Sequence, residues 1–389
     1  MNFEFATATR IIFGPGTLME AIPEIAAFGK HALLVTGRNP DRHGKIKKSL
    51  MANGMDVSTF QVPGEPTTAL VEDGARQARQ GNCDMVLAVG GGSVVDAGKA
   101  IAAMMTNTNP LKDYLEVIGK GQPLKSAPVP FVAVPTTAGT GAEVTRNAVL
   151  GEPSHHVKVS LRSPLMLPRL AIVDPELTLS LPPEVTAATG MDALTQLVEA
   201  FLSLKSNPMT DGLCREGLVR CSRSIITAVR DGGDMAARID MSLASLFSGL
   251  ALANGGLGAV HGIAGPLGGW APVPHGVICG RLLPLVFETN RRLLASEYGS
   301  EDILKRFDDI ARMVTGEPMA TARVGTQWFQ GLREELKISS LSQYEGLSLS
   351  DLPKIAQNAL NASSMKGNPV TLGITDIIDI LQRAMERDS

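Results

Sequence analysis

Short apolar runs of strand length alternate with segments of helical pattern through the first half of the chain. The strand-like runs are "HALLVTG" (31–37), "DVSTFQV" (56–62), "DMVLAVG" (84–90) and "FVAVPTT" (131–137). Between these runs lie segments whose sequence pattern is compatible with helices, residues 44–53 and 68–80. Because this alternation joins parallel strands through helical crossovers, it predicts an α/β fold with a doubly wound parallel sheet. Such sheets bind ligands at the carboxyl ends of their strands.

The pattern changes near Pro182, after which long helix-like stretches rich in Ala, Leu, Met and Arg follow one another. A chain of 389 residues is long enough for two or three domains. We therefore predict an α/β domain over residues 1–180, followed by an all-helical domain over residues 181–389.

Charge and composition exclude several classes of partner. A net charge of −3 leaves no basic face for nucleic acid. The N-terminus "MNFEFATATRIIFG" has no apolar core of signal-peptide length, so we expect a cytoplasmic protein. The four cysteines include no CxxC pair, which favours buried free thiols over disulfides or a thiolate zinc site.

Residues 241–280 contain no Asp, Glu, Lys or Arg, yet they hold two of the six histidines of the chain. Pro266 and frequent glycines break any apolar helix of membrane-spanning length in this segment, so we expect no membrane span. We interpret it as a buried helix, with His261 near its end, followed by an irregular Gly/Pro-rich loop.

The stretch "MVLAVGGGSVVDAGKA" has the pattern of a strand, a glycine turn and a helix. Gly91 and Gly92 let the backbone approach an anion closely, and Ser93 can cap a helix whose free N–H groups attract phosphate. This predicts a site for a dinucleotide pyrophosphate. The Rossmann fingerprint would need glycine at Val95, so a tight turn without a ligand stays an alternative.

A second small, hydroxyl-rich loop, "PTTAGTGAEVT", follows the next strand. Thr136, Thr137 and Thr140 can donate to phosphate or ribose oxygens. Two such loops after neighbouring strands favour one extended ligand, and Lys158 can add a positive charge. The alternatives are a flexible loop and a solvent-facing lysine.

One carboxylate, one amide and two imidazoles suggest a metal site. Asp192 and Gln196 are four residues apart and so share one helix face. With His261 and His275 they can surround one divalent ion and leave a position open for substrate. The alternative is that each histidine is a hydrogen-bonded core residue.

These motifs resemble those of the iron-dependent alcohol dehydrogenases. The resemblance rests on "GPGTL", "GGGSVVDAGKA", "PTTAGTGAEVT", "PPEVTAATGMDALTQLVEA" and "VPHG", which together span nearly the whole chain. It implies hydride transfer between NAD(P) and a small alcohol or carbonyl substrate that is bound to a divalent metal. It also implies that residues 1–180 bind NAD(P), that residues 181–389 bind metal and substrate, and that Asp192, His261 and His275 are metal ligands. The chain departs from the family at Gln196 and Gly265, where histidine is usual, so both Fe²⁺ and Zn²⁺ stay open.

The resemblance also bears on the cofactor and on assembly. Family members that prefer NAD often carry Asp after the first strand, where this chain has Gly37 followed by Arg38. Loss of that carboxylate favours a 2′-phosphate, so we expect NADP to be tolerated or preferred. The resemblance further suggests a homodimer or larger oligomer. Two alternatives remain: a metal-dependent lyase of the dehydroquinate synthase type, or a nucleotide-binding relative without catalysis or metal.

Overall fold

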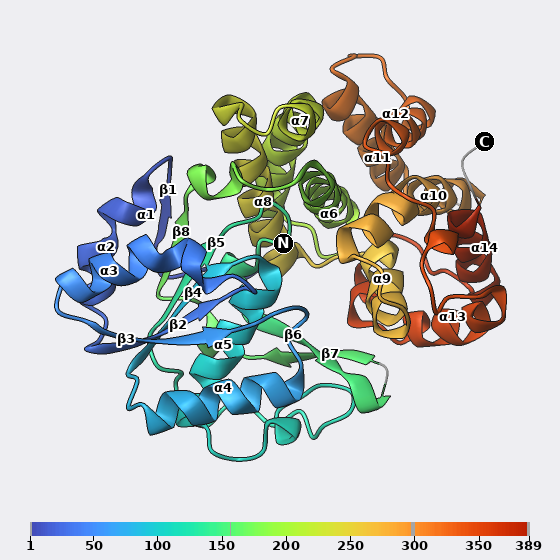
Figure 1. The fold of residues 1–389 in the computed structure, drawn as a ribbon. Helices are drawn as coiled ribbons and strands as arrows, with labels where there is room; N and C mark the ends of the chain where they lie inside the picture. Colours follow the sequence, from blue (N-terminus) through green and yellow to red (C-terminus); the bar gives the residue numbers. More distant parts are fainter. Residues whose placement is uncertain (1, 156, 297–299, 387–389) are drawn as a thin grey trace. The chain divides into compact units, whose positions relative to one another are not determined.

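The computed structural model describes residues 2–155, 157–296 and 300–386 and divides into two compact units (Figure 1). The first, which we call the α/β unit, comprises Ala6–Leu179. The second, the helical unit, runs from Ser180 onward and includes residues 2–5. The predicted order of an α/β part followed by a helical part is confirmed. That the units are independent domains with a boundary at residue 180 stays a prediction.

The α/β unit is built on a parallel sheet with the strand order β1-β8-β5-β4-β2-β3. All four predicted strands and both predicted helices are present, whereas the short strands β1 and β8 and an antiparallel hairpin were not predicted. The sheet strands are β1 Ile11–Phe13, β2 His31–Thr36, β3 Asp56–Gln61, β4 Met85–Gly90, β5 Phe131–Pro135 and β8 Leu170–Val173, and the hairpin strands are β6 Asn147–Glu152 and β7 Val157–Arg162. The helices are α1 Thr17–Glu20, α2 Ile22–Ala26, α3 Gly44–Ala52, α4 Thr68–Gln80 and α5 Gly92–Thr106.

Helices cover both faces of this sheet (Figure 1). Alternate residues of β2 point to opposite faces, as the period of a strand requires. Leu33 and Val35 pack in one core with α4 and α5, and Ala32 and Leu34 pack in another with α1, α2 and α3. Burial on both faces explains why β2, β4 and β5 appear in the sequence as continuous apolar runs.

The order of the strands locates a ligand site. The chain adds β3 on one side of β2 and then returns to add β4 on the other side, so the direction of strand addition reverses between β2 and β4. Sheets of this type bind ligands at the carboxyl ends of the strands that flank such a reversal. Gly37 follows β2 and Gly91 follows β4, so both glycines lie at this position.

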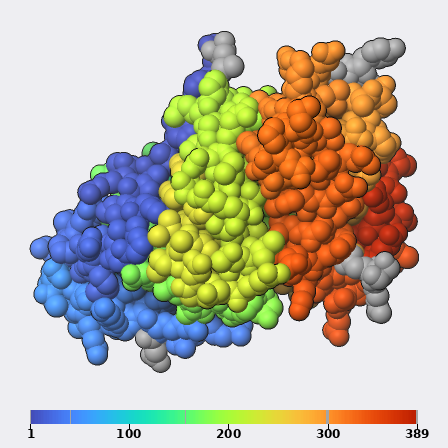
Figure 2. Space-filling model, turned by 90° about the horizontal axis from the view of Figure 1, so that it is seen from above, coloured from blue at the N-terminus to red at the C-terminus, as the bar shows by residue number. Residues whose placement is uncertain are grey.

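The helical unit contains the longer helices. Figure 2 shows the yellow-green residues of α7 and α8 beside the orange residues of α11 and α12. Arg306 of α11 donates to Asp211 of α7 at 2.9 Å, which joins two of these helices. The helices are α6 Pro183–Leu202, α7 Pro208–Arg230, α8 Met235–Gly255, α9 Ala259–Trp270, α10 His275–Ser296, α11 Glu301–Thr315, α12 Ala322–Glu335, α13 Leu352–Leu360 and α14 Ile374–Met385.

The predicted irregular loop after His261 is wrong, because that segment forms helix α9. Each glycine costs a helix up to about 1 kcal/mol, which is why the sequence pattern argued against one. Close packing accounts for the difference. A Cβ at Gly262 would lie 2.9 Å from Met365 Cε, and Val260 and Ile263 are buried. Burial of this apolar face therefore stabilises a helix that intrinsic propensity disfavours.

Among the described residues, α8 is the one helix that has the length and the composition of a membrane span. Of the most apolar 18-residue stretch of this helix, 67% is buried inside the fold. A core helix has the same composition, so the apolar character of α8 follows from its packing against α6 and α7.

Candidate metal centre and nucleotide-binding turn

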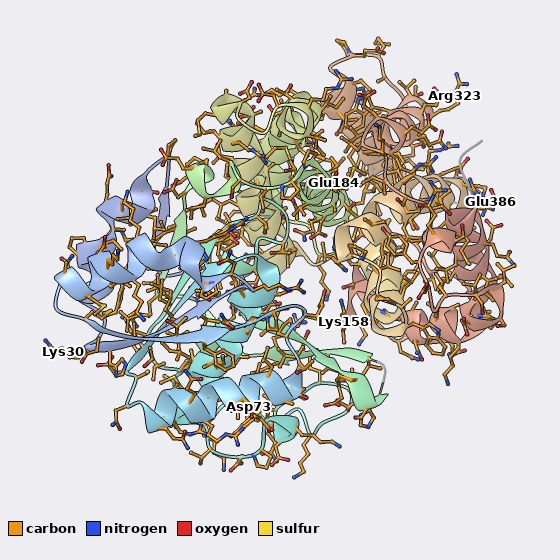
Figure 3. The ribbon with its side chains drawn as sticks, viewed as in Figure 1. Lys30, Asp73, Lys158, Glu184, Arg323 and Glu386 are labelled. Atoms are coloured by element: carbon orange, nitrogen blue, oxygen red, sulfur yellow. The ribbon has the colours of Figure 1, made fainter. Side chains whose placement is uncertain are left out.

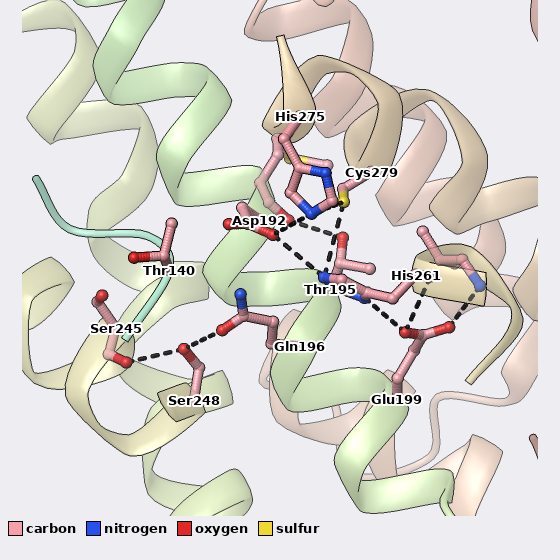
Figure 4. A network of polar contacts seen from close by, with 12 residues as sticks. Thr140, Asp192, Thr195, Gln196, Glu199, Ser245, Ser248, His261, His275 and Cys279 are labelled. Atoms are coloured by element: carbon pink, nitrogen blue, oxygen red, sulfur yellow. Dashed lines mark hydrogen bonds and ion pairs between the residues drawn. The ribbon is translucent and has the colours of Figure 1, made fainter. Parts of the chain in front are cut away.

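Three helices of the helical unit bring four potential metal ligands together (Figure 4). Asp192 comes from α6, His261 from α9, and His275 and Cys279 from α10. Their ligand atoms all lie within 4.8 Å of one another. Asp192 Oδ1 is 3.2 Å from His261 Nε2 and 3.7 Å from His275 Nε2. The structure therefore brings together three of the four residues that the sequence suggested as ligands.

The two histidines lie at the starts of two helices, one of which, α9, the sequence analysis did not predict. His261 lies in the first turn of α9 and not near the end of a helix, contrary to the sequence interpretation. His275 is the first residue of α10. Asp192 lies inside α6 with a side chain that is 3% exposed, so all three approach one point from separate elements.

The fourth predicted ligand, Gln196, has a different partner. Its Oε1 accepts a hydrogen bond of 2.7 Å from the Ser248 hydroxyl of α8 (Figure 4). Cys279, which we interpreted as a buried free thiol, is buried but lies in the cluster. Its Sγ is 3.6 Å from His275 Nε2 and 3.8 Å from His261 Nε2. The spacing of four residues between His275 and Cys279 was the available signal, because it places them on one helix face.

Glu199 is a further functional residue that the sequence analysis missed. Its Oε2 accepts from His261 Nδ1 at 2.7 Å, and its Oε1 accepts from the Val260 backbone N–H at 2.5 Å. The carboxylate thus caps the start of α9 and holds the proton of His261 on Nδ1, which leaves Nε2 to face Asp192. Glu199 stands seven residues after Asp192, on the same face of α6.

The cluster favours positive charge. Burial alone would raise the pKa of Asp192, but the hydrogen bond from His261 and the ring of His275 hold it below its ordinary value. Burial alone would lower the pKa of His261, yet the Cys279 sulfur and the carboxylates of Asp192 and Glu199 raise it well above its usual range. A bound cation would compete with protons for the imidazoles, so metal affinity falls at acid pH.

The donor set fits a divalent transition metal. A carboxylate oxygen, two imidazole nitrogens and a thiol sulfur are the groups that bind zinc and iron in proteins. Calcium and magnesium prefer oxygen ligands alone. Asp192, His261 and His275 would hold such an ion.

Replacing Glu199 with Gln tests its role in orienting His261. The amide oxygen of Gln can still accept a hydrogen bond from the backbone N–H. It lacks the negative charge that strengthens the hydrogen bond from the His261 imidazole. We expect metal affinity to fall by about 10- to 100-fold, the usual effect of losing an outer partner of a ligand. Competition with a chromophoric chelator measures this, and Glu184→Gln, an exposed position on the same helix, serves as the control. Equal affinities for the two variants would contradict the prediction.

The packing of α10 against α6 offers a second test. A Cβ at Gly276, beside His275, would lie 1.9 Å from the carbonyl oxygen of Ala188, a backbone atom that cannot turn away. In Gly276→Ala the start of α10 must therefore move. We expect the free energy of unfolding to fall by about 1–3 kcal/mol and metal binding to weaken. Gly265→Ala in α9 is the control, because its Cβ would meet nothing within 4 Å. Urea unfolding and metal titration of both variants measure the difference, and a stable, metal-binding Gly276→Ala would refute the steric argument.

In the α/β unit, the predicted glycine turn joins β4 to α5. Helix α5 begins at Gly92, and its N-cap is Gly91, without a side-chain cap. Ser93 is therefore the second helical residue, and its predicted role as the cap is wrong. Since β4 runs through Gly90, one residue separates strand from helix, and the first N–H groups of α5 are left for an anion.

The glycine turn and the threonine loop touch. A Cβ at Gly91 would lie 3.2 Å from Thr137 Cγ2, and one at Gly92 would lie 2.7 Å from Thr140 Cγ2. The absence of side chains at both glycines therefore lets the two loops meet at the carboxyl ends of β4 and β5. The two segments that we predicted to share one extended ligand are neighbours in the structure.

The other residues predicted to bind the cofactor lie nearby or on the hairpin. The Thr136 N–H donates to the Gly90 carbonyl at 2.9 Å. A Cβ at Gly37 would lie 3.9 Å from Val94 in the first turn of α5. Lys158, labelled in Figure 3, lies on β7, where its Nζ is 3.1 Å from the Glu65 carboxylate. The lysine is therefore paired within the protein.

Comparison with known proteins identifies the family of the chain. The family model described as iron-containing alcohol dehydrogenase matches residues 8–175, and the one described as Fe-containing alcohol dehydrogenase family, C-terminal, matches residues 186–385. The chain belongs to the iron-containing alcohol dehydrogenase family. It is thus an oxidoreductase of the alcohol dehydrogenase type, and the resemblance seen in its motifs is confirmed.

Several relatives are similar to this chain over most or all of their length. A choline dehydrogenase of Bacillus subtilis is 33% identical over 371 residues, 94% of this chain and 90% of the relative. The crystal structure of a 1,3-propanediol oxidoreductase matches with a TM-score of 0.90 and 33% identity, over 99% of this chain and 100% of that one. A sulfoacetaldehyde reductase from Bifidobacterium kashiwanohense in complex with NAD⁺ matches with a TM-score of 0.87 and 27% identity, over 100% of both chains.

Proposed function

We propose that this alcohol dehydrogenase interconverts a small alcohol and its aldehyde or ketone with NAD(P) and a divalent metal, Fe²⁺ or Zn²⁺. The convergence of Asp192, His261 and His275 on one point supports the metal. The open N-terminus of α5 against the threonine loop supports the nucleotide. A lyase of the dehydroquinate synthase type is disfavoured, because the matching family is that of the alcohol dehydrogenases.

A bound divalent ion supplies Lewis acidity to the substrate oxygen, and a bound nicotinamide supplies or accepts the hydride. The residues of the chain hold and orient these groups. Asp192 contributes a buried negative charge, and Glu199 fixes the His261 ring so that Nε2 faces the cluster. Position 265 is glycine and carries no imidazole that could move a proton. We therefore propose that the proton for the alcohol comes from water.

The segment after β2 supports the use of NADP. Gly37 places no carboxylate there, and the guanidinium of Arg38 lies beside the end of β3, where it donates to the Pro63 carbonyl at 3.2 Å. An exposed arginine in this position can pair with a 2′-phosphate.

Arg38→Ala is expected to raise KM for NADPH about 10- to 150-fold, because a hydrogen bond to a charged group contributes roughly 1.5–3 kcal/mol. The KM for NADH, which has no 2′-phosphate, serves as the internal control and should stay within about twofold. Steady-state kinetics with both nucleotides measure the effect. Equal changes for NADPH and NADH would mean that Arg38 does not recognise the phosphate.

The test of the function is reduction of aldehydes by the intact protein, purified without air and without chelator. The names of the relatives span choline, 1,3-propanediol and sulfoacetaldehyde, so the panel needs cationic, neutral and anionic substrates. We expect NADPH or NADH oxidation with at least one aldehyde, and its loss on chelation. Nucleotide binding without turnover by metal-loaded protein, with every aldehyde and alcohol tried, would favour the non-catalytic alternative.

A homo-oligomer and a cytoplasmic location stay predictions. Light scattering tests the oligomeric state.

A further inference from the structure

The proposed metal site lacks the histidine that the family usually has where this chain has Gln196. The amide oxygen of Gln196, the atom that would bind a metal, accepts the hydrogen bond from Ser248 of α8. To act as a ligand, Gln196 would have to give up or share that bond. Another side chain of the cluster, Cys279, already faces both imidazoles.

We propose that Cys279 is a protein ligand of the metal and takes the place left by the missing histidine. The inference deepens the proposed function, since it rests on a metal at Asp192, His261 and His275. It completes a set of one carboxylate, two imidazoles and one thiolate. It also assigns the site a preference for Zn²⁺ over Fe²⁺, since thiolate is a soft ligand that selects zinc.

The four distances that join Cys279 and Asp192 to the two imidazoles agree with a tetrahedral site. Zinc lies about 2.0–2.1 Å from nitrogen and about 2.3 Å from sulfur, so two such ligands at the tetrahedral angle are about 3.6 Å apart. Cys279 Sγ lies 3.6 Å from His275 Nε2 and 3.8 Å from His261 Nε2. An oxygen and a nitrogen ligand are expected about 3.4 Å apart. Asp192 Oδ1 lies 3.2 and 3.7 Å from the same two nitrogens.

The fold holds Cys279 in this place. It lies one helical turn after His275 on α10, so both side chains reach the same side of the helix. The sulfur is buried, and it contacts the Nε2 atoms of two proposed ligands and the carboxylate of the third, Asp192. Cys221, by contrast, lies on α7 with its sulfur 3.9 Å from a backbone carbonyl, that of Gly190. Four protein ligands still admit a substrate, because zinc sites can expand to five ligands.

X-ray absorption at the zinc edge tests the proposal on the full chain loaded with one equivalent of Zn²⁺. We expect one sulfur at about 2.3 Å in addition to nitrogen and oxygen at about 2.0–2.2 Å. The sulfur should disappear in Cys279→Ser and persist in Cys221→Ala, a buried cysteine outside the cluster. Zinc affinity should fall by more than about 100-fold in Cys279→Ser, since even loss of an outer partner costs about 10- to 100-fold. Gln196→Ala should change zinc affinity by less than about threefold.

Metal selection gives a second readout. When the metal-free protein is offered equal amounts of Zn²⁺ and Fe²⁺ without air, elemental analysis should find zinc. Cys279→Ser should shift the bound metal toward iron. If that variant does not fold, a thiolate-to-cobalt charge-transfer band in the Co²⁺-loaded protein gives the same information without any substitution.

The outcomes separate this inference from the proposed function. Bound zinc without a sulfur neighbour, or a sulfur that persists in Cys279→Ser, would overturn the role of Cys279 and leave the metal site intact. Failure of the protein to bind any of the three metals would overturn both.

Discussion

Replacing Asp192 with Asn is expected to lower the rate of NAD(P)H-dependent aldehyde reduction by about three orders of magnitude or more. The carboxylate is the negatively charged oxygen donor of the cluster, and its side chain is 3% exposed. Asparagine keeps its volume but removes the charge, so the ion is lost or weakly held. Polarisation of a carbonyl by a metal contributes several kcal/mol, and each 1.4 kcal/mol is a factor of about ten in rate.

The measurement pairs steady-state kinetics with metal content for each variant. Asp302→Asn, an exposed aspartate of α11, serves as the control and should keep both the metal and the rate. Circular dichroism confirms that the fold is retained. An Asp192→Asn protein that lacks metal but turns over at the unaltered rate would show that the reaction does not depend on this site.

Replacing Lys99 with Met should produce the largest loss of stability in the α/β unit. Its Nζ donates at 2.8 Å to each of three oxygens, the carbonyls of Ala142 and Asn147 and the hydroxyl of Thr145. Lys99, on α5, thereby holds the loop that follows β5 in place by hydrogen bonds. This loop carries the threonines of the proposed nucleotide site. Loss of one member of such a buried charged group costs about 3–5 kcal/mol.

The acidic neighbours of Lys99 explain the size of this effect. Burial raises the pKa of Asp96 to about 6 and that of Glu143 to about 7, while the charge of Lys99 opposes both shifts. Burial also lowers the pKa of Lys99 to about 8. Without the ammonium group, the carboxylates and the three oxygens would be buried with no cation nearby.

These pKa shifts also predict how stability depends on pH. Because Asp96 and Glu143 titrate higher in the folded protein than in an unfolded chain, the folded state holds more protons and stability falls as pH rises from about 4 to 7. In Lys99→Met the total fall should be larger and should continue to higher pH, since the charge that lowers both pKa values is gone. Urea unfolding at several pH values measures it, with Lys112→Met, an exposed position, as the control. A parallel pH dependence in wild type and Lys99→Met would contradict the coupling.

Much of the fold followed from local sequence pattern. Strand assignments succeeded for β2, β4 and β5, because burial on both faces of a parallel sheet leaves a continuous apolar run in the sequence. The half-buried edge strand β3 and the helices α3 and α4 were also assigned correctly. Helix α9 was missed, since its glycines and Pro266 lower helix propensity and the compensating contacts come from distant residues such as Met365. Ser93 was assigned as a cap because the exact residue at which a strand becomes a helix is not encoded in composition.

The sequence by itself determined the two-part architecture and the glycine turn, because periodicity and residue type reveal which local structures are available. Its resemblance to a known family indicated the acid and imidazole residues of the candidate metal site. Only the tertiary structure decided which of these side chains meet. It turned Gln196 toward Ser248, brought Cys279 between two imidazoles and set Glu199 behind His261. The physical reason is that these contacts join α6, α8, α9 and α10, whose mutual positions depend on how their buried faces pack and not on the sequence of any one of them.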